Sequence, residues 1–331
     1  MDTAAFYQKF IHDLRNEQVK YDGILPGVIP VLDPNGPIFS SVWGDIATFL
    51  PMVVYEHSGN TEMLRSSYPM MKDWVDKITR EDQARGQKYL YDFVFNGWGL
   101  KFASDKDNQI TKTIFFENVF AQDVTCVDMR PFVLEGGSID SDGQGTLLTT
   151  KECLCSLNRN EYLEQEEIEG ELKHAFGLER VIWLDHGGIA GDDTDSHVDI
   201  MARFCSPDTI AYTQCEDESD ENYAELHAME EQLKTLRTLD GKPYKLVPLP
   251  LPDALYLDDY RLPGSYANFL IINGAVLVPG ADSPKDEIAR KRLQEVFPDR
   301  TVKVIDCRPL LSGHGGLHCV TMQFPEGWLA Q

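Results

Sequence analysis

The hydrophobic positions between residues 4 and 87 recur at intervals of three and four, which is the spacing of one face of an α-helix. They fall into groups that begin at Phe6, Ile46 and Met70. Between the first and second groups, residues 22–37 are rich in proline and glycine, as is typical of loops. The pattern therefore predicts three helices, with a long loop after the first.

After Tyr89 the pattern changes to short apolar runs bounded by turn residues, which predicts β-strands. The predicted strands are 89–95, 145–150, 181–184, 209–213, 244–248, 269–278, 301–306 and 320–323. Helical spacing recurs over 164–176, 223–238 and 285–296. Strands and a helix alternate about every 60 to 70 residues, so we expect repeated α/β modules.

The composition narrows the classes of partner and compartment. The chain has 331 residues, of which 42% are hydrophobic, enough to bury a core. A net charge of −24 opposes binding to nucleic acid or to anionic membranes. We see neither a leader peptide nor an apolar stretch of about 18 residues. The seven scattered cysteines suit reduced thiols in the cytoplasm.

Cys319 is the best candidate for a nucleophile in this sequence. The segment 312–320 places it after a glycine-rich loop and before a predicted strand. Glycines let the backbone pass close to a ligand, and a strand would hold the sulfur on a rigid element. The alternative is that Cys319 is a small buried hydrophobic residue. Cys153 and Cys155 lack a second pair at zinc-like spacing, so we expect no metal there.

Other polar segments could converge with Cys319. Glu135 leaves an apolar run and enters paired glycines, although it could equally be a solvated turn residue. If 196–204 is extended, His197 and Asp199 share one face. The alternative there is a polar turn with a surface histidine. Residues 266–274 read as a buried strand entering a turn.

These segments together resemble the agmatine deiminase family of amidine hydrolases. The matching stretches occur in family order from about Tyr91 to the C-terminus. They are 95–99, 134–138, 146–150, 158–160, 183–187, 191–199, 202–204, 266–274 and 315–320. The resemblance implies an α/β fold, the five-bladed propeller of the guanidine-modifying enzymes, known as the pentein fold. The modular pattern of strands and helices agrees with that expectation.

The resemblance implies that Cys319, His197, Asp199 and Glu135 act on a guanidinium group. A guanidinium is delocalised and charged, so we expect Asp199 and Glu135 to clamp it. The thiolate of Cys319 would attack the guanidinium carbon. His197 would protonate the leaving ammonia and then deprotonate the water that resolves the covalent adduct. The implied reaction converts agmatine and water to N-carbamoylputrescine and ammonia, without a metal or an organic cofactor.

The same resemblance places further residues beside the substrate. Asp193 or Asp195 would meet the amine of agmatine, and Gly316 belongs to the glycine loop that would approach the ligand. We expect His314 and His318 to have structural or solvent-facing roles. A small cationic substrate is the expected partner, and a homo-oligomer is a further expectation. Neither nucleic acid nor a membrane is expected to bind.

Upstream of Tyr91 the family should supply another module, with a Trp-x-Arg-Asp segment whose aspartate completes the clamp. This sequence lacks that segment, and Trp43-Gly44-Asp45 is only a superficial substitute. Residues 4–93 resemble instead a helical piece of the (α/α)6 barrel of bacterial alpha-L-rhamnosidases. The matching stretches are 6–10, 13–15, 22–26, 43–45 and 68–74.

These resemblances imply a chimera of two parts. Residues 1–90 form the helical rhamnosidase-like fragment, and residues 91–331 form an incomplete propeller domain that lacks its first module. The leading prediction is an agmatine deiminase. One alternative is a non-catalytic module that binds guanidinium groups or polyamines, or a misfolded chimera. The other is a fragment of a glycoside hydrolase, although the acid-bearing segments of an inverting mechanism are missing.

Overall fold

The computed structural model describes residues 11, 14–15, 61–62, 65–71 and 88–330. The chain divides into two compact units, Met1–Lys88 and Tyr89–Gln331. Apart from Lys88, which begins a strand, the described residues of the first unit are helical, and Leu14 and Met70 are buried. Most of the three predicted helices, the loop at 22–37 and the segment 43–45 lie outside the described residues.

The second unit is built from α/β modules of one design. Three sheets have three strands each, and in each the first two strands form an antiparallel hairpin. The middle strand then pairs in parallel with the third. The sheets are β3 (Ile139–Ser141), β4 (Thr146–Thr150) and β5 (Arg180–Leu184); β6 (Ala202–Ser206), β7 (Thr209–Gln214) and β8 (Lys245–Pro250); and β11 (Leu270–Ile272), β12 (Ala275–Gly280) and β13 (Thr301–Asp306).

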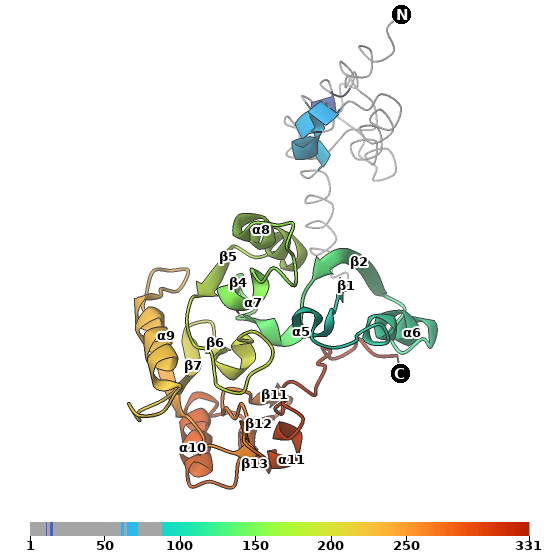
Figure 1. The fold of residues 1–331 in the computed structure, drawn as a ribbon. Helices are drawn as coiled ribbons and strands as arrows, with labels where there is room; N and C mark the ends of the chain where they lie inside the picture. Colours follow the sequence, from blue (N-terminus) through green and yellow to red (C-terminus); the bar gives the residue numbers. More distant parts are fainter. Residues whose placement is uncertain (1–10, 12–13, 16–60, 63–64, 72–87, 331) are drawn as a thin grey trace, which may run out of the picture. The chain divides into compact units, whose positions relative to one another are not determined.

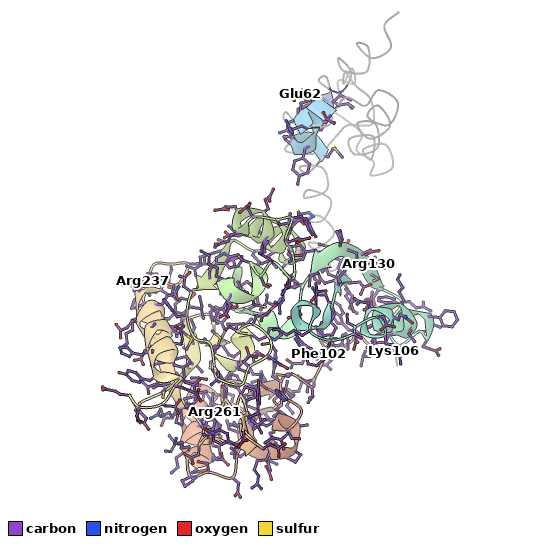
Figure 2. All side chains as sticks on the ribbon, viewed as in Figure 1. Glu62, Phe102, Lys106, Arg130, Arg237 and Arg261 are labelled. Atoms are coloured by element: carbon purple, nitrogen blue, oxygen red, sulfur yellow. The ribbon has the colours of Figure 1, made fainter. Side chains whose placement is uncertain are left out.

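Each parallel pair is joined by a crossover that contains one helix of 12 or 13 residues, as is usual for parallel strands, and the crossover from β4 to β5 also contains a short helix. The longer helices are α8 (Gln165–Phe176), α9 (Tyr223–Thr235) and α10 (Lys285–Val296). They lie at the outside of the second unit, with the strands nearer its centre (Figure 1). Exposed cationic side chains, including Lys106, Arg130 and Arg237, project outward from the unit (Figure 2).

A two-stranded sheet precedes these modules. It pairs β1 (Lys88–Val94) with β2 (Val124–Val133). The remaining elements are short. They are α5 (Gly97–Leu100), η1 (Asp107–Gln109), α6 (Ile110–Phe116), η2 (Gly136–Ser138), α7 (Lys151–Leu154), η3 (Val198–Ile200), β9 (Tyr256–Leu257), β10 (Tyr260–Arg261) and α11 (Arg308–Leu311). None of the described helices is both long enough and apolar enough to cross a membrane.

The hydrophobic core is shared between neighbouring modules. One cluster joins Leu148 of β4 to Ile210 of β7 and Met229 of α9. A second cluster joins Val247 of β8 to Val278 of β12. Because each module buries apolar surface against the next, the loops at the ends of different sheets are held at fixed positions. That arrangement brings together side chains that are far apart in the sequence.

Several sequence-based predictions differ from the structure. The predicted strand 320–323 is irregular: a turn closes between His318 and Thr321, and Gln323 reaches β11 through its side chain rather than through strand pairing. Residues 198–200 form a 3-10 turn, so 196–204 is not extended throughout. The predicted strand 269–278 is two strands joined by the two-residue turn Asn273-Gly274, where Gly274 has a φ of +75°.

Candidate active site

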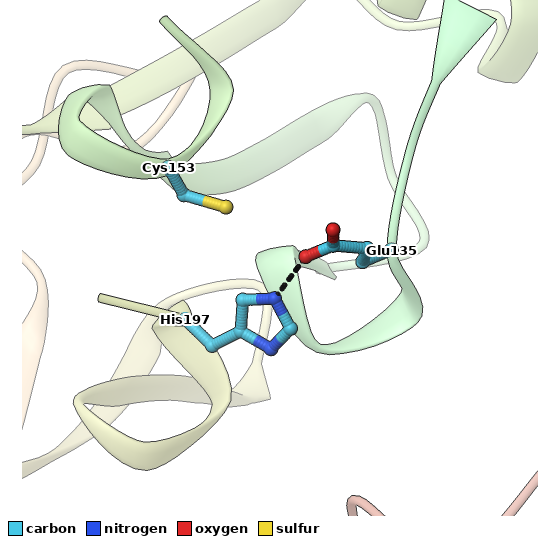
Figure 3. Close-up of side chains that lie close together, drawn as sticks. All are labelled: Glu135, Cys153 and His197. Carbon is cyan, nitrogen blue, oxygen red and sulfur yellow. Dashed lines mark hydrogen bonds and ion pairs between the residues drawn. The ribbon is translucent and has the colours of Figure 1, made fainter. Parts of the chain in front are cut away.

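Glu135 and His197 form a buried pair between two segments that lie 62 positions apart. Glu135 leaves the end of β2 and precedes η2, while His197 precedes η3. Nε2 of His197 lies 2.5 Å from Oε2 of Glu135, and each residue is 5% exposed (Figure 3). A hydrogen bond that joins a carboxylate to an imidazole fixes the orientation of the ring.

Arg159 holds the other side of Glu135. Its Nε lies 3.1 Å from Oε1 and its Nη2 lies 3.0 Å from Oε2, which is the bidentate geometry of a strong ion pair. Its Nη1 also donates to Asp195, at 2.6 Å. Asp195 in turn accepts from the exposed Lys101. A continuous chain of charged groups therefore runs from the surface to His197.

The protonation of this pair follows from its contacts. Burial alone would lower the pKa of His197, but hydrogen bonds to Cys153 and Glu135 outweigh it and raise the pKa above its usual value. Burial would likewise raise the pKa of Glu135, but the hydrogen bonds from His197 and Arg159 lower it. The pair is therefore an imidazolium and a carboxylate near neutral pH, with a proton available on the histidine.

Asp199 is fully buried and only one of its two oxygens is bonded. Its Oδ2 accepts from Nδ2 of Asn268 at 3.0 Å and lies 2.9 Å from Nδ1 of His318. Its Oδ1 is buried and has no hydrogen-bond partner among the described residues. Burial opposes its charge, but the bond to His318 and the nearby His197 lower its pKa. A buried, ionised carboxylate with one oxygen that lacks a hydrogen bond is suited to bind a cation, because the cation would supply the missing donor.

Cys319 lies beside this carboxylate. Its Sγ lies 3.5 Å from Oδ2 of Asp199 and 3.2 Å from Nδ2 of Asn268. The residue as a whole is exposed, whereas its sulfur lies in partly buried contacts with Asn268 and Asp199. The atoms packed around the sulfur and the charge of Asp199 raise the pKa of the Cys319 thiol to about 12. The free protein therefore carries a neutral thiol at this position.

Two glycines allow these groups to approach one another. A Cβ on Gly137 would lie 2.6 Å from Nδ1 of His197 and 3.0 Å from Oδ2 of Asp199. Both side chains therefore pack directly against the backbone of Gly137. A Cβ on Gly316 would lie 2.2 Å from Oδ1 of Asn268. Gly316 is thus required for contact with Asn268, which itself contacts both Asp199 and Cys319.

The structure therefore brings Cys319, His197, Asp199 and Glu135 into one cluster. The two further acids differ in their surroundings. Asp195 is held by Arg159 and Lys101, and burial opposes its charge while those two cations lower its pKa. The carboxylate of Asp193 has one ion-pair neighbour among the described residues, Nδ1 of His314 at 3.9 Å, while its backbone carbonyl accepts from Lys101.

Three residues of the cluster were not predicted as site residues. Arg159, Asn268 and His318 each lie inside a stretch that carries the family resemblance. His318 was expected to have a structural or solvent-facing role, yet its Nδ1 contacts Asp199 directly. The available signal was the occurrence of these polar residues within the matched stretches, beside residues already assigned to the site.

Comparison with known proteins places the chain in a family. The model of the Porphyromonas-type peptidyl-arginine deiminase family matches residues 58–325. The agmatine deiminase of Ectopseudomonas mendocina is 33% identical over 330 aligned residues, which cover 88% of each chain. That of Pseudomonas aeruginosa is 34% identical over 327 residues, again covering 88% of each chain.

Solved structures give the same result. A proposed arginine deiminase from Porphyromonas gingivalis is 54% identical, with a TM-score of 0.72 over 73% of this chain and 71% of that one. The agmatine deiminase of C. jejuni with substrate bound is 43% identical, with a TM-score of 0.64 over 69% and 66%. The α/β fold is thus that of deiminases. The chain belongs to the family of the Porphyromonas-type peptidyl-arginine deiminases and the agmatine deiminases.

The family match also bears on the N-terminal part. It begins at residue 58, inside the segment that resembles a rhamnosidase. The relatives described above are deiminases, and they give no support to that resemblance.

Proposed function

We propose that this chain is a hydrolase that converts agmatine and water to N-carbamoylputrescine and ammonia. The observation that carries the proposal is the unbonded buried oxygen of Asp199 beside the thiol of Cys319. A guanidinium would supply the missing donor to Oδ1 and would bring its carbon close to the sulfur. The relatives support this choice, because several are agmatine deiminases.

The chemistry would begin with binding of the cation. A positive charge beside Cys319 opposes the effect of Asp199 and lowers the pKa of the thiol, so the thiol releases its proton to solvent and becomes a thiolate when substrate is present. The sulfur attacks the guanidinium carbon, and the bond from that carbon to a terminal nitrogen breaks. His197 gives its proton to the departing nitrogen, which leaves as ammonia. A thiouronium adduct on Cys319 remains.

Water would complete the reaction. His197, now neutral, takes a proton from a water molecule that attacks the carbon of the adduct. The carbon–sulfur bond then breaks, the sulfur of Cys319 leaves as a thiolate with the bonding electrons, and the added hydroxyl loses its proton to solvent as N-carbamoylputrescine forms. We expected Glu135 to clamp the guanidinium together with Asp199. Because both of its oxygens are bonded to Arg159 and His197, we assign Glu135 to holding His197 instead.

The far amine of agmatine would bind Asp193 rather than Asp195. Asp195 already bonds to Lys101 and Arg159, so a second cation would have to displace one of them. Asp193 is 28% exposed at its side chain and contacts only His314, at 3.9 Å, among the ion pairs of the described residues. Among the described residues, its carboxylate therefore has no lysine or arginine as an ion-pair partner that an amine would have to displace.

For the fold, we propose an incomplete five-bladed propeller over 91–331. The three repeated modules and the two-stranded sheet β1–β2 support it, because that sheet has one strand fewer than the others. We also propose that residues 1–90 form a separate helical part, fused to the propeller. All seven cysteines are free, which is in keeping with the cytoplasmic location that we propose.

The relatives do not favour the two alternatives, a non-catalytic binding module and a glycosidase. The deciding experiment measures ammonia release from agmatine, arginine and an N-acylated arginine amide, with Cys319→Ala as the control. We expect the wild type to release ammonia from agmatine but not from the other two compounds. We expect Cys319→Ala to release none from any of them. Labelling with a haloacetamidine supplies a second test, in which Cys319 should react faster than Cys307 and Cys126. Equal labelling of the three thiols would refute the assignment of the nucleophile.

A further inference from the structure

Cys153 is a buried thiol that the proposed reaction does not use. It belongs to α7, which follows the central strand β4, and it is 0% exposed. The sulfur of Cys153, a ring nitrogen of His197 and a carboxylate oxygen of Glu135 all lie within 4.8 Å of one another (Figure 3). The three side chains come from three separate segments of the chain, so the cluster could not be seen in the spacing of Cys153 and Cys155.

The donor set of this cluster is selective. A thiolate, an imidazole and a carboxylate are the ligands of Zn²⁺, whereas Mg²⁺ and Ca²⁺ prefer oxygen alone. Zn²⁺ lies about 2.3 Å from sulfur and about 2.0 Å from nitrogen or oxygen, so tetrahedral ligand atoms lie roughly 3.5 Å apart. The sulfur would move inward by about 1 Å, and the 2.5 Å contact between His197 and Glu135 would open by a similar amount.

We propose that Cys153, His197 and Glu135 form an inhibitory Zn²⁺ site. The metal replaces the proton of the Cys153 thiol and the proton between His197 and Glu135, and both protons are released. Arg159 keeps its bond to Oε1 of Glu135, whereas Zn²⁺ takes the place of His197 on Oε2 and shares that oxygen with Nη2 of Arg159. With its Nε2 bound to the metal, His197 can no longer carry the proton of the reaction. The inhibition rests on the proposed function, whereas the binding does not.

The test measures binding directly, on the full-length chain after removal of metals with a chelator. Zn²⁺ is titrated in competition with a chromophoric chelator, using wild type, Cys153→Ser, Cys155→Ser and Cys319→Ser. Cys155→Ser is the matched control, because it removes the neighbouring thiol, which lies outside the cluster. We expect Cys153→Ser to weaken binding by at least the roughly 10- to 100-fold that supporting residues of metal sites contribute. Cys155→Ser and Cys319→Ser should bind as the wild type does.

The Cys319→Ser variant separates this site from the nucleophile. If Zn²⁺ binding is lost in Cys319→Ser and kept in Cys153→Ser, the metal sits on the nucleophile and the proposal is overturned. Should Cys153→Ser fail to fold, X-ray absorption of the Zn²⁺ complex of Cys319→Ser decides. One sulfur at about 2.3 Å is expected there, and a shell of nitrogen and oxygen alone would refute the site.

Inhibition is measured separately, as the Zn²⁺ concentration that halves ammonia release from agmatine. This concentration should be unchanged in Cys155→Ser and raised in Cys153→Ser, each relative to its own activity without metal. If no variant or wild type releases ammonia while Zn²⁺ still binds through Cys153, the proposed function fails and the metal site stands.

Discussion

Arg159 holds Glu135 through two parallel hydrogen bonds of 3.1 and 3.0 Å, and both side chains are almost fully buried. Arg159 bonds to Glu135, and Glu135 bonds to His197. Arg159 therefore affects His197 indirectly, by holding Glu135 in position. A lysine offers one point charge in place of the planar fork and cannot keep both bonds. The ion pair therefore sets the orientation of the imidazole.

Arg159→Lys is predicted to lower kcat by about 30-fold to several thousand-fold, which corresponds to the roughly 2–5 kcal/mol of a disrupted buried charge pair. The KM for agmatine should change less, because Arg159 does not touch Asp199. Steady-state kinetics would measure both constants. Arg180→Lys is the control, since Arg180 bonds to Tyr244 and to the backbone of Arg237. A rise in KM with unchanged kcat would contradict the positioning role.

Gly316→Ala tests the contact beneath the nucleophile. Its Cβ would lie 2.2 Å from Oδ1 of Asn268, so either the loop or Asn268 must move. We expect a loss of about 1–3 kcal/mol in the free energy of unfolding and a drop in turnover of 10-fold or more. Gly313→Ala is the matched control, because its Cβ would approach only the carbonyl of Leu310, at 3.5 Å. Equal effects of the two substitutions would argue against the contact.

The sequence predicted the elements whose signal is local. The strand β4 and the helix α10 were predicted to within one residue, because the first is a short run of threonine and leucine after a glycine and the second is an amphipathic pattern. The strand expected at 320–323 was wrong, because a strand also needs a partner that its own residues do not reveal. The strand β2 was not predicted, because apolar and polar residues do not alternate regularly along it.

The site shows the same division. Cys319, His197, Asp199 and Glu135 could be named from motifs. The contacts of Asn268 with Cys319 and of His318 with Asp199 span 51 and 119 positions, and only the packing of the modules brings such residues together. The family resemblance therefore named four residues that lie together in the structure, whereas the packing determined which neighbours surround them.

The buried pair of His197 and Glu135 should make stability depend on pH. The pKa of His197 is raised in the folded state, so its contribution is complete below the unfolded value of about 6.5 and is lost as the pH rises through the raised pKa. The pKa of Glu135 is lowered, so its contribution is present above about 4.3 and is lost as the pH falls through the lowered pKa.

Wild type should therefore exceed His197→Gln in free energy of unfolding most clearly between about pH 4.5 and 6.5, by about 3 kcal/mol. Urea denaturation followed by circular dichroism across pH 3 to 9 would show it. His186→Gln, in the exposed pair with Glu225, should alter stability little at any pH. A difference between wild type and His197→Gln that does not vary with pH would argue against the pairing.

Asp199 has two opposite effects on Cys319, and one substitution can separate them. Its charge raises the pKa of the thiol, whereas its unbonded oxygen is proposed to bind the guanidinium that lowers it again. Asp199→Asn removes the charge, so the pKa of the free thiol should fall below about 12 and Cys319 should react faster with iodoacetamide at a given pH. Ammonia release should nevertheless fall by 30-fold or more, because the clamp on the substrate is gone.

The rate of alkylation as a function of pH gives the thiol pKa, and mass spectrometry identifies the labelled cysteine. Asp193→Asn is the matched control, since Asp193 is assigned to the far amine and should raise KM without shifting the thiol pKa. If Asp199→Asn left the reactivity of Cys319 unchanged, the 3.5 Å contact between the carboxylate and the sulfur would not exist in solution. If instead turnover rose together with reactivity, Asp199 would be a burden on the nucleophile rather than part of the substrate site.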